Sequence, residues 1–296
     1  MTLRQALTAA TAQLANDEDI RETASRDAEL LLLHTLQIPR VTLLAHPSRE
    51  LSPEQHALYR TNIARRLQHH PIQYITGQQE FYGLLLKVTP AVLIPRPETE
   101  HLVEAVLKRV PADQPARIAD IGTGSGAIAI ALAVHLPHAE ITALDLSPEA
   151  LTVAAANARE HNVAHRIHLQ QSDLLSALSL NKADAGNSQS FDAIVSNPPY
   201  VPESDHATLH PQVRDHEPVA ALFAGPDGLD LYRRLIPQAH AALKANGLLA
   251  LEIGHGQREA IAALLKSWHE VSFLDDLQQI PRVALARKPP TLSQKG

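Results

Sequence analysis

The sequence predicts an α/β protein in which a mostly parallel sheet, with helices on both faces, follows a small all-helical module. Three observations support this fold class. Residues 1 to about 75 carry apolar side chains at helical spacing and show no strand signal. From residue 116 onward, short apolar strands alternate with helical segments, which is typical of a parallel sheet. Three glycines separate the first strand of this alternation from its helix, where such sheets bind ligands.

The helical module is predicted to span residues 1–76. Its first two helices are expected near residues 3–14 and 24–37, and Pro39 ends the second. A third helix begins after Ser52, a predicted N-cap, with Pro53 at the first helical position and Gln55 three residues after the cap. Tyr59 lies on the apolar face of this helix.

A hairpin linker is predicted over residues 77–97, because Gly77 and Gly83 flank a β-leaning run with two aromatic residues. Residues 98–296 are predicted to form the second domain. Its strands are expected at 116–121, 140–146, 166–170, 191–196 and 247–254, and the last two, 270–276 and 281–287, should form an antiparallel hairpin at one edge. Its helices are expected at 98–110, 126–136, 147–161, 229–245 and 257–268. We expect a mobile loop over 181–190 and a disordered tail over 288–296.

Composition excludes several classes of protein. The chain has 296 residues and no cysteine, which excludes disulfides, thiolate nucleophiles and cysteine-based zinc sites. Its 17 histidines are scattered, so we expect no metal site. The net charge is −6 and no basic run stands out, which argues against a surface built for bulk nucleic acid. The chain has neither an apolar run of roughly 18 residues nor a signal-peptide pattern at its start, so a cytoplasmic protein is expected.

The glycine loop "DIGTGSGAIAI" predicts a nucleotide-type cofactor. Gly122, Gly124 and Gly126 allow a tight turn and a close approach of the backbone to a ligand. Asp145 ends the next strand, where a carboxylate can accept hydrogen bonds from two ribose hydroxyls. Gly122, Gly124 and Ala127 also satisfy the dinucleotide pattern G-x-G-x-x-A, so the loop alone does not distinguish NAD from S-adenosylmethionine. A strand–helix junction without a ligand is the structural alternative.

A polar pair, Ser172 and Asp173, follows the third strand of the predicted sheet. Polar side chains at this end of a strand can contact the amino group of an adenine. Asp173 could equally serve as a helix N-cap. The sequence does not decide between these two roles.

The motif "NPPY" at residues 197–200 ends the fourth strand of the sheet, which should lie beside the first and therefore open near the glycine loop. Asn197 offers an amide oxygen, Pro198 and Pro199 stiffen the backbone, and Tyr200 offers a flat apolar face. This set suits a planar, neutral group with an NH₂, whose two N–H bonds the Asn197 oxygen and the Pro198 carbonyl can accept. A plain turn with Tyr200 in the core is the alternative.

The chemistry of such an NH₂ group favours one cofactor. An amide or aryl NH₂ is a poor nucleophile because its lone pair is delocalised, and two fixed acceptors favour a geometry that aims this lone pair at an electrophile. A sulfonium methyl is such an electrophile, whereas hydride transfer has no use for this site. NPPY beside the glycine loop therefore favours S-adenosylmethionine.

The chain resembles the HemK/PrmC family, the protein-(glutamine-N5) methyltransferases that modify peptide chain release factors. The resemblance covers nearly the whole chain and rests on "HPIQYITGQQEFYG", "VLIPRPETE", "DIGTGSGAIAI", "ALDLSPEAL", "FDAIVSNPPYV" and "HEPVAALFAGPDGLDLYRRL", in this order. It implies a class I, Rossmann-like methyltransferase sheet behind an N-terminal helical domain that helps to hold the release factor. It also implies methylation of the glutamine in the Gly-Gly-Gln loop.

The resemblance implies roles for individual residues. The cofactor residues are Gly122, Thr123, Gly124, Ser125, Gly126, Asp145, Asp173, Leu174 and Asn197; the substrate residues are Asn197, Pro198, Pro199 and Tyr200, of which Asn197, Pro198 and Tyr200 are catalytic. This chain departs from the family pattern at two positions. Leu174 stands where some members have an aromatic residue near the adenine, and Gln279 stands where glycine is expected.

Two other functions share part of this evidence. NPPY also marks enzymes that methylate the amino group of adenine in DNA or RNA, which should carry a basic groove and a means of flipping a base. The G-x-G-x-x-A pattern alone would fit a nicotinamide-binding oxidoreductase or a binding module without catalysis.

Overall fold

The computed structural model describes residues 1–178 and 190–290. Residues 181–189 of the predicted loop and residues 291–296 of the predicted tail lie outside these residues. The chain divides into two compact units, one of Met1–Gln78 with Ala207–Glu217 and one of Gln79–His206 with Pro218–Gly296. None of the helices within the described residues is long and apolar enough to cross a membrane.

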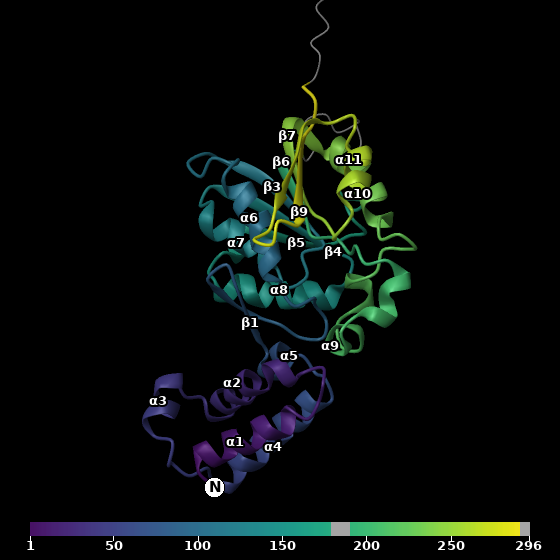
Figure 1. The fold of residues 1–296 in the computed structure, drawn as a ribbon. Coiled ribbons are helices and arrows are strands. Elements are labelled where there is room, and N and C mark those ends of the chain that lie inside the picture. The colour runs from purple at the N-terminus through teal and green to yellow at the C-terminus, as the bar shows by residue number, and fades with distance from the viewer. Residues whose placement is uncertain (179–189, 291–296) are drawn as a thin grey trace, which may run out of the picture. The chain divides into compact units, whose positions relative to one another are not determined.

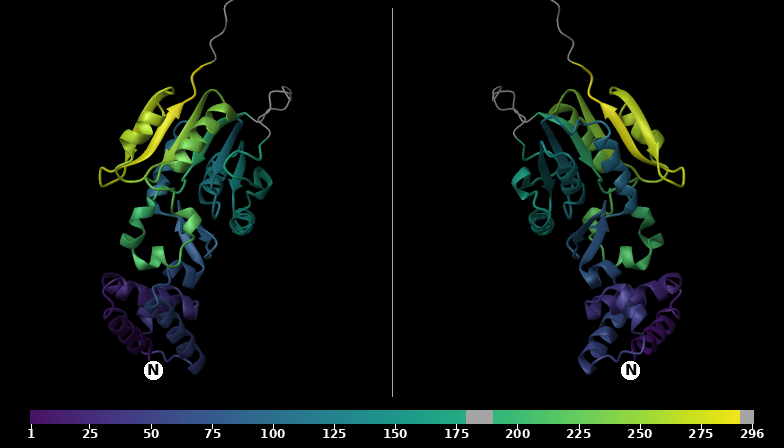
Figure 2. Two further views of the ribbon diagram at one scale, coloured as in Figure 1. Left: turned by 90° about the vertical axis from the view of Figure 1, so that its right-hand side faces the viewer. Right: turned by 90° about the vertical axis from the view of Figure 1, so that its left-hand side faces the viewer.

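The N-terminal part of the first unit, Met1–Gln78, is a bundle of helices, drawn in purple and blue in Figure 2. They are α1 (Leu3–Leu14), α2 (Ala24–Leu36), α3 (Arg40–Ala45), α4 (Pro53–Leu67) and α5 (Ile72–Thr76), with a 3₁₀ turn, η1, at Arg21–Thr23. The predicted N-cap of α4 is confirmed, since Ser52 and Gln55 form a capping box and Pro53 is the first helical residue. The short helices α3 and α5 were not predicted.

A buried ion pair lies in the interior of this bundle. Arg66 Nε donates to Asp27 Oδ2 at 2.7 Å, and both side chains are almost fully buried. The Thr23 hydroxyl donates to the same carboxylate oxygen, and the Tyr59 hydroxyl donates to the carbonyl of Ala28. These bonds join α2 to α4, so the polar groups inside the bundle are paired.

A segment distant in sequence, Ala207–Glu217, belongs to the same unit. His210 Nε2 lies 2.9 Å from the carbonyl oxygen of Asp19, and His216 Nε2 lies 2.9 Å from that of Gln68. The rings of His216 and His70 have centroids 4.1 Å apart. This segment includes the short helix α9 (Pro211–Arg214), and sequence patterns did not predict its return to the first unit.

The second unit begins with a hairpin and continues as a seven-stranded sheet (Figure 1). The hairpin pairs β1 (Gln78–Phe81) with β2 (Leu84–Lys87). The order in the sheet is β5-β4-β3-β6-β7-β9-β8. These strands are β3 (Ala116–Ile121), β4 (Ala139–Asp145), β5 (Ile167–Gln171), β6 (Phe191–Ser196), β7 (Leu243–Glu252), β8 (His269–Asp275) and β9 (Pro281–Arg287).

The sheet confirms the predicted fold class. Strand β6 pairs in parallel with β3, as predicted, and β5, β4 and β7 are also parallel. The last two strands are antiparallel, with β8 at the edge. Chain connections leave β3 in one direction, toward β4 and β5, and resume in the other direction at β6, so the switch point of the sheet lies between β3 and β6.

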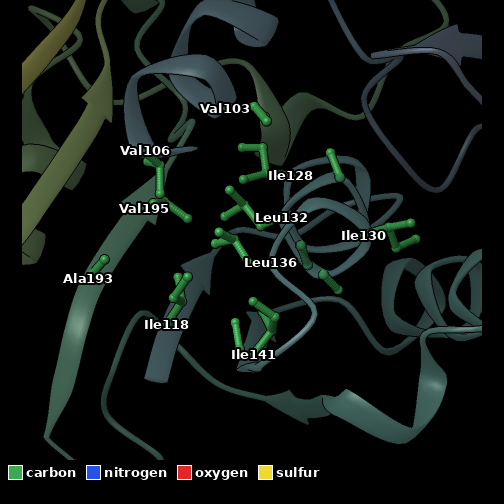
Figure 3. Close-up of a cluster of buried hydrophobic side chains, with 14 of the residues drawn as sticks. Val103, Val106, Ile118, Ile128, Ile130, Leu132, Leu136, Ile141, Ala193 and Val195 are labelled. Carbon is green, nitrogen blue, oxygen red and sulfur yellow. The ribbon is translucent and has the colours of Figure 1, made fainter. Parts of the chain in front are cut away.

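Helices cover both faces of this sheet and bury it in two apolar clusters. On one face, α6 (Glu100–Leu107) and α7 (Ala127–His135) pack on the strands, and α8 (Pro148–Glu160) joins them. Figure 3 shows this cluster, with Val103, Val106, Ile128 and Leu132 from the helices facing Ile118, Ile141 and Val195 from the strands. On the other face, α10 (Asp230–Ala242) and α11 (Arg258–Leu264) pack on the strands. Burial on both faces explains the near-continuous apolar runs of β3 and β6.

The turn before β9 leads to a stability prediction. Gln279 has a φ of +62°, a left-handed conformation that is cheap for glycine and costly for other residues. We expect Gln279→Gly to raise the free energy of unfolding by about 0.5–1 kcal/mol, measured by urea denaturation. The control is Gln278→Gly in the same turn. Since Gln278 is not in this conformation, glycine there should lower stability. Equal effects of the two substitutions would contradict the argument.

Candidate active site

A pocket of the second unit lies at the carboxyl ends of β3, β4 and β6. It brings together most of the residues singled out from the sequence: Gly122, Gly124, Asp145, Ser172, Asp173, Leu174, Asn197, Pro198 and Pro199. Thr123, Ser125, Gly126 and Tyr200 do not line it. The pocket is further lined by Ala91, Val92, Leu93, Ile121, Leu146, Ser147, Ala150, Ser196, Pro218, Ala220, Ala221 and Leu231.

Two of the three glycines face open space. Gly122 and Gly124 have φ values of +72° and +54°, and a Cβ added to either would meet no atom within 4 Å. Gly126 differs, because a Cβ there would lie 3.0 Å from Ile130 Cδ1 and 3.2 Å from Ala154 Cβ. The first two glycines therefore form a cradle that a side chain would fill, whereas Gly126 lets α7 pack closely on α8.

Hydrogen bonds to buried side chains of the protein fix the conformation of this glycine loop. The Thr123 hydroxyl donates to Asp120 Oδ2 at 2.6 Å, and the Ser125 carbonyl accepts from Asn157 Nδ2 at 2.9 Å. Thr123 and Ser125 are buried, and neither lines the pocket. The loop is thus prearranged by the protein itself.

Asp145 stands at the end of β4 with its carboxylate fixed. Oδ2 accepts from the backbone N–H of Gly124 at 2.8 Å, and Oδ1 accepts from the backbone N–H of Ser147 at 2.9 Å. Each oxygen keeps a lone pair for a further donor. A glycine cradle beside an oriented carboxylate fits the ribose of S-adenosylmethionine, with its hydroxyls as the donors.

Asp120 is a buried acid beneath the glycine loop that sequence reasoning missed. Burial raises the pKa of this carboxyl to about 7, although the hydrogen bond from Thr123 lowers it. Its second oxygen, Oδ1, has no hydrogen-bond partner within residues 1–178 and 190–290. The signal in the sequence was an acid inside the apolar strand "ARIADI".

The residues after β5 adopt an irregular path along the pocket. Ser172 Oγ accepts from the backbone N–H of Ala177, and Asp173 Oδ2 accepts from Arg234 at 2.5 Å. In the described part of the chain, no α-helix begins at Asp173, so its alternative role as an N-cap is wrong. Leu174 is buried, has a φ of +52° and lines the pocket, where an aliphatic side chain can cover an adenine ring.

The NPPY segment starts where β6 and β3 are tied together. The Ser196 hydroxyl donates to the carbonyl of Ile121 at 2.7 Å, next to the glycine loop. Asn197 Nδ2 donates to Thr99 Oγ1 at 3.1 Å. Asn197 lines the pocket, and this hydrogen bond gives its NH₂ group a partner inside the protein.

Tyr200 is held by the end of β7 instead of lining the pocket. Its carbonyl accepts from Gln257 Nε2 at 3.0 Å, and its hydroxyl donates to Glu252 Oε1 at 3.4 Å. A Cβ on Gly254 would lie 2.9 Å from Tyr200 Cδ2, so only glycine leaves room for the ring. Sequence reasoning missed Thr99, Glu252 and Gln257, of which Glu252 had a signal as an acid within the apolar run "LLALEIG".

Comparisons with known proteins agree with this geometry. The model of the methyltransferase small domain matches residues 98–213, and that of the PrmC N-terminal domain matches residues 5–77. Among solved structures, the hMettl16 catalytic domain is 16% identical with a TM-score of 0.54, covering 72% of this chain and 78% of that one. The T. thermophilus 16S rRNA N2 G1207 methyltransferase is 19% identical with a TM-score of 0.52, covering 71% and 49%. At these identities the likeness concerns the fold. Fold, pocket and domain model together define an S-adenosylmethionine-dependent methyltransferase.

Relatives at higher identity define the family. The release factor glutamine methyltransferase of Koribacter versatilis is 44% identical over 98% of this chain and 99% of the relative. That of Escherichia coli is 42% identical over 90% and 93%, and that of Caulobacter vibrioides is 40% identical over 98% of both. The chain belongs to the release factor glutamine methyltransferase family.

Proposed function

We propose that this chain transfers a methyl group from S-adenosylmethionine to the side-chain amide nitrogen, N5, of the glutamine in the Gly-Gly-Gln motif of class I peptide chain release factors. One observation carries the proposal: the Asn197 amide lies in the same pocket as the glycine cradle and Asp145, with its NH₂ group already bound to Thr99. Its oxygen is therefore the end available to a substrate NH₂.

The cofactor side of the pocket is assigned first. Gly122 and Gly124 let the backbone approach the cofactor, and Asp145 accepts from its ribose hydroxyls. Asp173, Leu174 and Asn197 complete the contacts, while Thr123, Ser125 and Gly126 act by shaping the loop. When bound, S-adenosylmethionine supplies an electrophilic methyl group on a positively charged sulfur.

The substrate side orients the glutamine. The Asn197 oxygen and the Pro198 carbonyl accept the two N–H bonds of the substrate amide, and Pro198 and Pro199 keep this backbone stiff. Fixed acceptors favour the geometry in which the nitrogen lone pair points at the methyl carbon. A bond forms between nitrogen and this carbon as the bond from carbon to sulfur breaks, and one proton leaves the nitrogen for solvent. Tyr200 contacts the end of β7 and thereby fixes the last residue of the NPPY motif in place.

The helical domain is proposed to hold the release factor. Residues 1–76 form the N-terminal domain in this scheme, residues 77–97 the hairpin linker and residues 98–296 the catalytic domain. The proposed partner is a protein, and no direct contact with nucleic acid is part of the proposal. The acidic net charge of −6 supports a protein substrate over a polyanion.

A labelled-methyl assay tests the proposed function. Purified full-length chain, S-adenosylmethionine with a labelled methyl group and a class I release factor should yield one methyl group on the Gly-Gly-Gln peptide, located by mass spectrometry. A release factor with glutamine replaced by alanine in that motif is the control and should stay unlabelled. Label on bare DNA or RNA that is lost at higher salt would instead support an adenine methyltransferase. NADH binding more tightly than S-adenosylmethionine would overturn the cofactor assignment.

A further inference from the structure

A hydrogen-bonded chain of side chains leads from Asn197 into the interior of the catalytic unit. Asn197 Nδ2 donates to Thr99 Oγ1 at 3.1 Å. The Thr99 hydroxyl lowers the pKa of the Glu252 carboxyl group, as a hydrogen-bond donor to that group does. A hydroxyl has a single proton, so when Thr99 donates to Glu252 it can only accept from Asn197. Donors and acceptors therefore alternate in a fixed order along this series of hydrogen bonds. This order places the NH₂ end of the Asn197 amide against Thr99.

Glu252 occupies a position that folding alone does not explain. Its side chain is 1% exposed, and its Oε2 has no hydrogen-bond partner in the described part of the chain. Burial raises the pKa of Glu252 to about 7, even though hydrogen bonds from Thr99 and Tyr200 lower it. A buried carboxyl with an unsatisfied oxygen is costly, and an apolar residue in the run "LLALEIG" would avoid that cost.

Glu252 also contacts the other end of the NPPY motif. Tyr200 donates its hydroxyl to Glu252 Oε1 at 3.4 Å, while the Tyr232 hydroxyl donates to the backbone carbonyl of Glu252 at 2.7 Å. One side chain at the end of β7 thus holds Asn197 through Thr99 and holds Tyr200 directly. Thr99 itself lies in a 3₁₀ turn, η2 (Pro97–Thr99), at the start of α6 and is 4% exposed.

We propose that Glu252 and Thr99 are positioning residues that set the orientation of the Asn197 amide, so that its oxygen and not its NH₂ faces the substrate nitrogen. This inference rests on the proposed function. Both orientations of an asparagine amide have the same shape, and only hydrogen bonds distinguish them. With the NH₂ end outward, the site would present donors to a substrate NH₂, which is itself a donor. A Thr99 hydroxyl that donates to Glu252 disfavours that arrangement, because it can then only accept from the Asn197 NH₂ group.

The first test removes the hydroxyl of Thr99 without changing the size of the side chain. We expect Thr99→Val to lower kcat for release-factor methylation about tenfold to thirtyfold, with the Kd for S-adenosylmethionine within about threefold of wild type. Thr99→Ser restores the hydroxyl and should recover most of the lost kcat. Thr142→Val removes a hydroxyl from the middle of β4 and serves as the matched control for folding.

The second test uses Glu252, in case Thr99→Val does not fold. Glu252→Leu removes the acceptor and frees the Thr99 hydroxyl to donate to the Asn197 oxygen, so kcat should fall by a similar factor. Glu252→Gln keeps an acceptor oxygen of the same reach and should lose much less. Cofactor titration of each variant shows whether the pocket is intact.

A double-mutant cycle separates positioning from general stability. If Thr99 acts through Asn197, Thr99→Val should cause little further loss of kcat in an Asn197→Ala background. Independent, additive losses, or a Thr99→Val enzyme with kcat within threefold of wild type, would overturn the inference. A wild-type enzyme that does not methylate the release factor would refute the proposed function itself, so the two failures are distinguishable.

Discussion

Asn197→Ala should lower the turnover of release-factor glutamine by about a hundredfold to a thousandfold, the usual effect of losing one preorganised polar contact. Alanine removes the amide oxygen that we propose accepts a substrate N–H, and the prolines and the loop remain. The side chain bonds only to Thr99 among the hydrogen bonds described, so its loss should leave the fold intact. The Kd for S-adenosylmethionine should stay within about tenfold of wild type, because Asn197 is one of many pocket residues.

Asn197→Asp gives a sharper result at the same position. The carboxylate keeps the size of the side chain, but it cannot donate to Thr99 as the Asn197 NH₂ group does. It adds a negative charge, which can attract the sulfonium cofactor but is unfavourable in a site that binds a neutral amide. We expect a large loss of kcat with cofactor affinity within about tenfold of wild type.

Rates are measured at saturating release factor and cofactor, with Asn16→Ala on the exposed surface after α1 as the control. If Asn197→Ala keeps more than about a tenth of the wild-type turnover, this residue is not the orienting acceptor. NPPY would then be a structural end of β6.

The sequence predicted the fold because its signals were local and repeated. Strands β3 and β6 are apolar runs buried on both faces, and Ser52 and Ser147 cap α4 and α8 with their own side chains. The neighbourhood of β3 and β6 followed from the strand order typical of such ligand-binding sheets. The features that could not be predicted depend on contacts between residues far apart in the sequence. The return of Ala207–Glu217 to the helical unit depends on single contacts such as His216 to Gln68, which have no periodic signature.

In the candidate site, too, local motifs could be predicted from the sequence and long-range contacts could not. The glycine loop and NPPY are contiguous motifs, so their residues could be named in advance, and most of them line one pocket. The sequence could not distinguish Gly122 and Gly124, which face open space, from Gly126, which faces α8. Thr99 and Glu252 lie far apart in the chain and meet Asn197 only in the folded unit. Tyr200 was expected to face the substrate. In the structure it contacts Glu252 and Gly254 at the end of β7, and no pattern in the sequence indicated these contacts.

Asp145→Ala should raise the Kd for S-adenosylmethionine by about a hundredfold or more. The carboxylate is fixed by the backbone N–H groups of Gly124 and Ser147, and we propose that its remaining lone pairs accept from two ribose hydroxyls. Hydrogen bonds to a charged group contribute about 1.5–3 kcal/mol each, and two of them correspond to at least a hundredfold in affinity. Alanine also releases the Gly124 N–H, which loosens the cradle.

Asp145→Asn should be nearly as harmful, although it is isosteric. Both carboxylate oxygens accept a backbone N–H, so either orientation of an amide turns its NH₂ group toward a donor. The matched control is Glu140→Gln, which neutralises an exposed carboxylate at the other end of β4 and should leave the Kd within about threefold of wild type. Titration calorimetry with S-adenosylmethionine measures all three variants. Because the defect concerns cofactor binding, saturating cofactor should restore much of the kcat of the Asp145 variants, in contrast to Asn197→Ala. An Asp145→Ala enzyme that binds the cofactor within tenfold of wild type would show that the ribose is held elsewhere in the pocket.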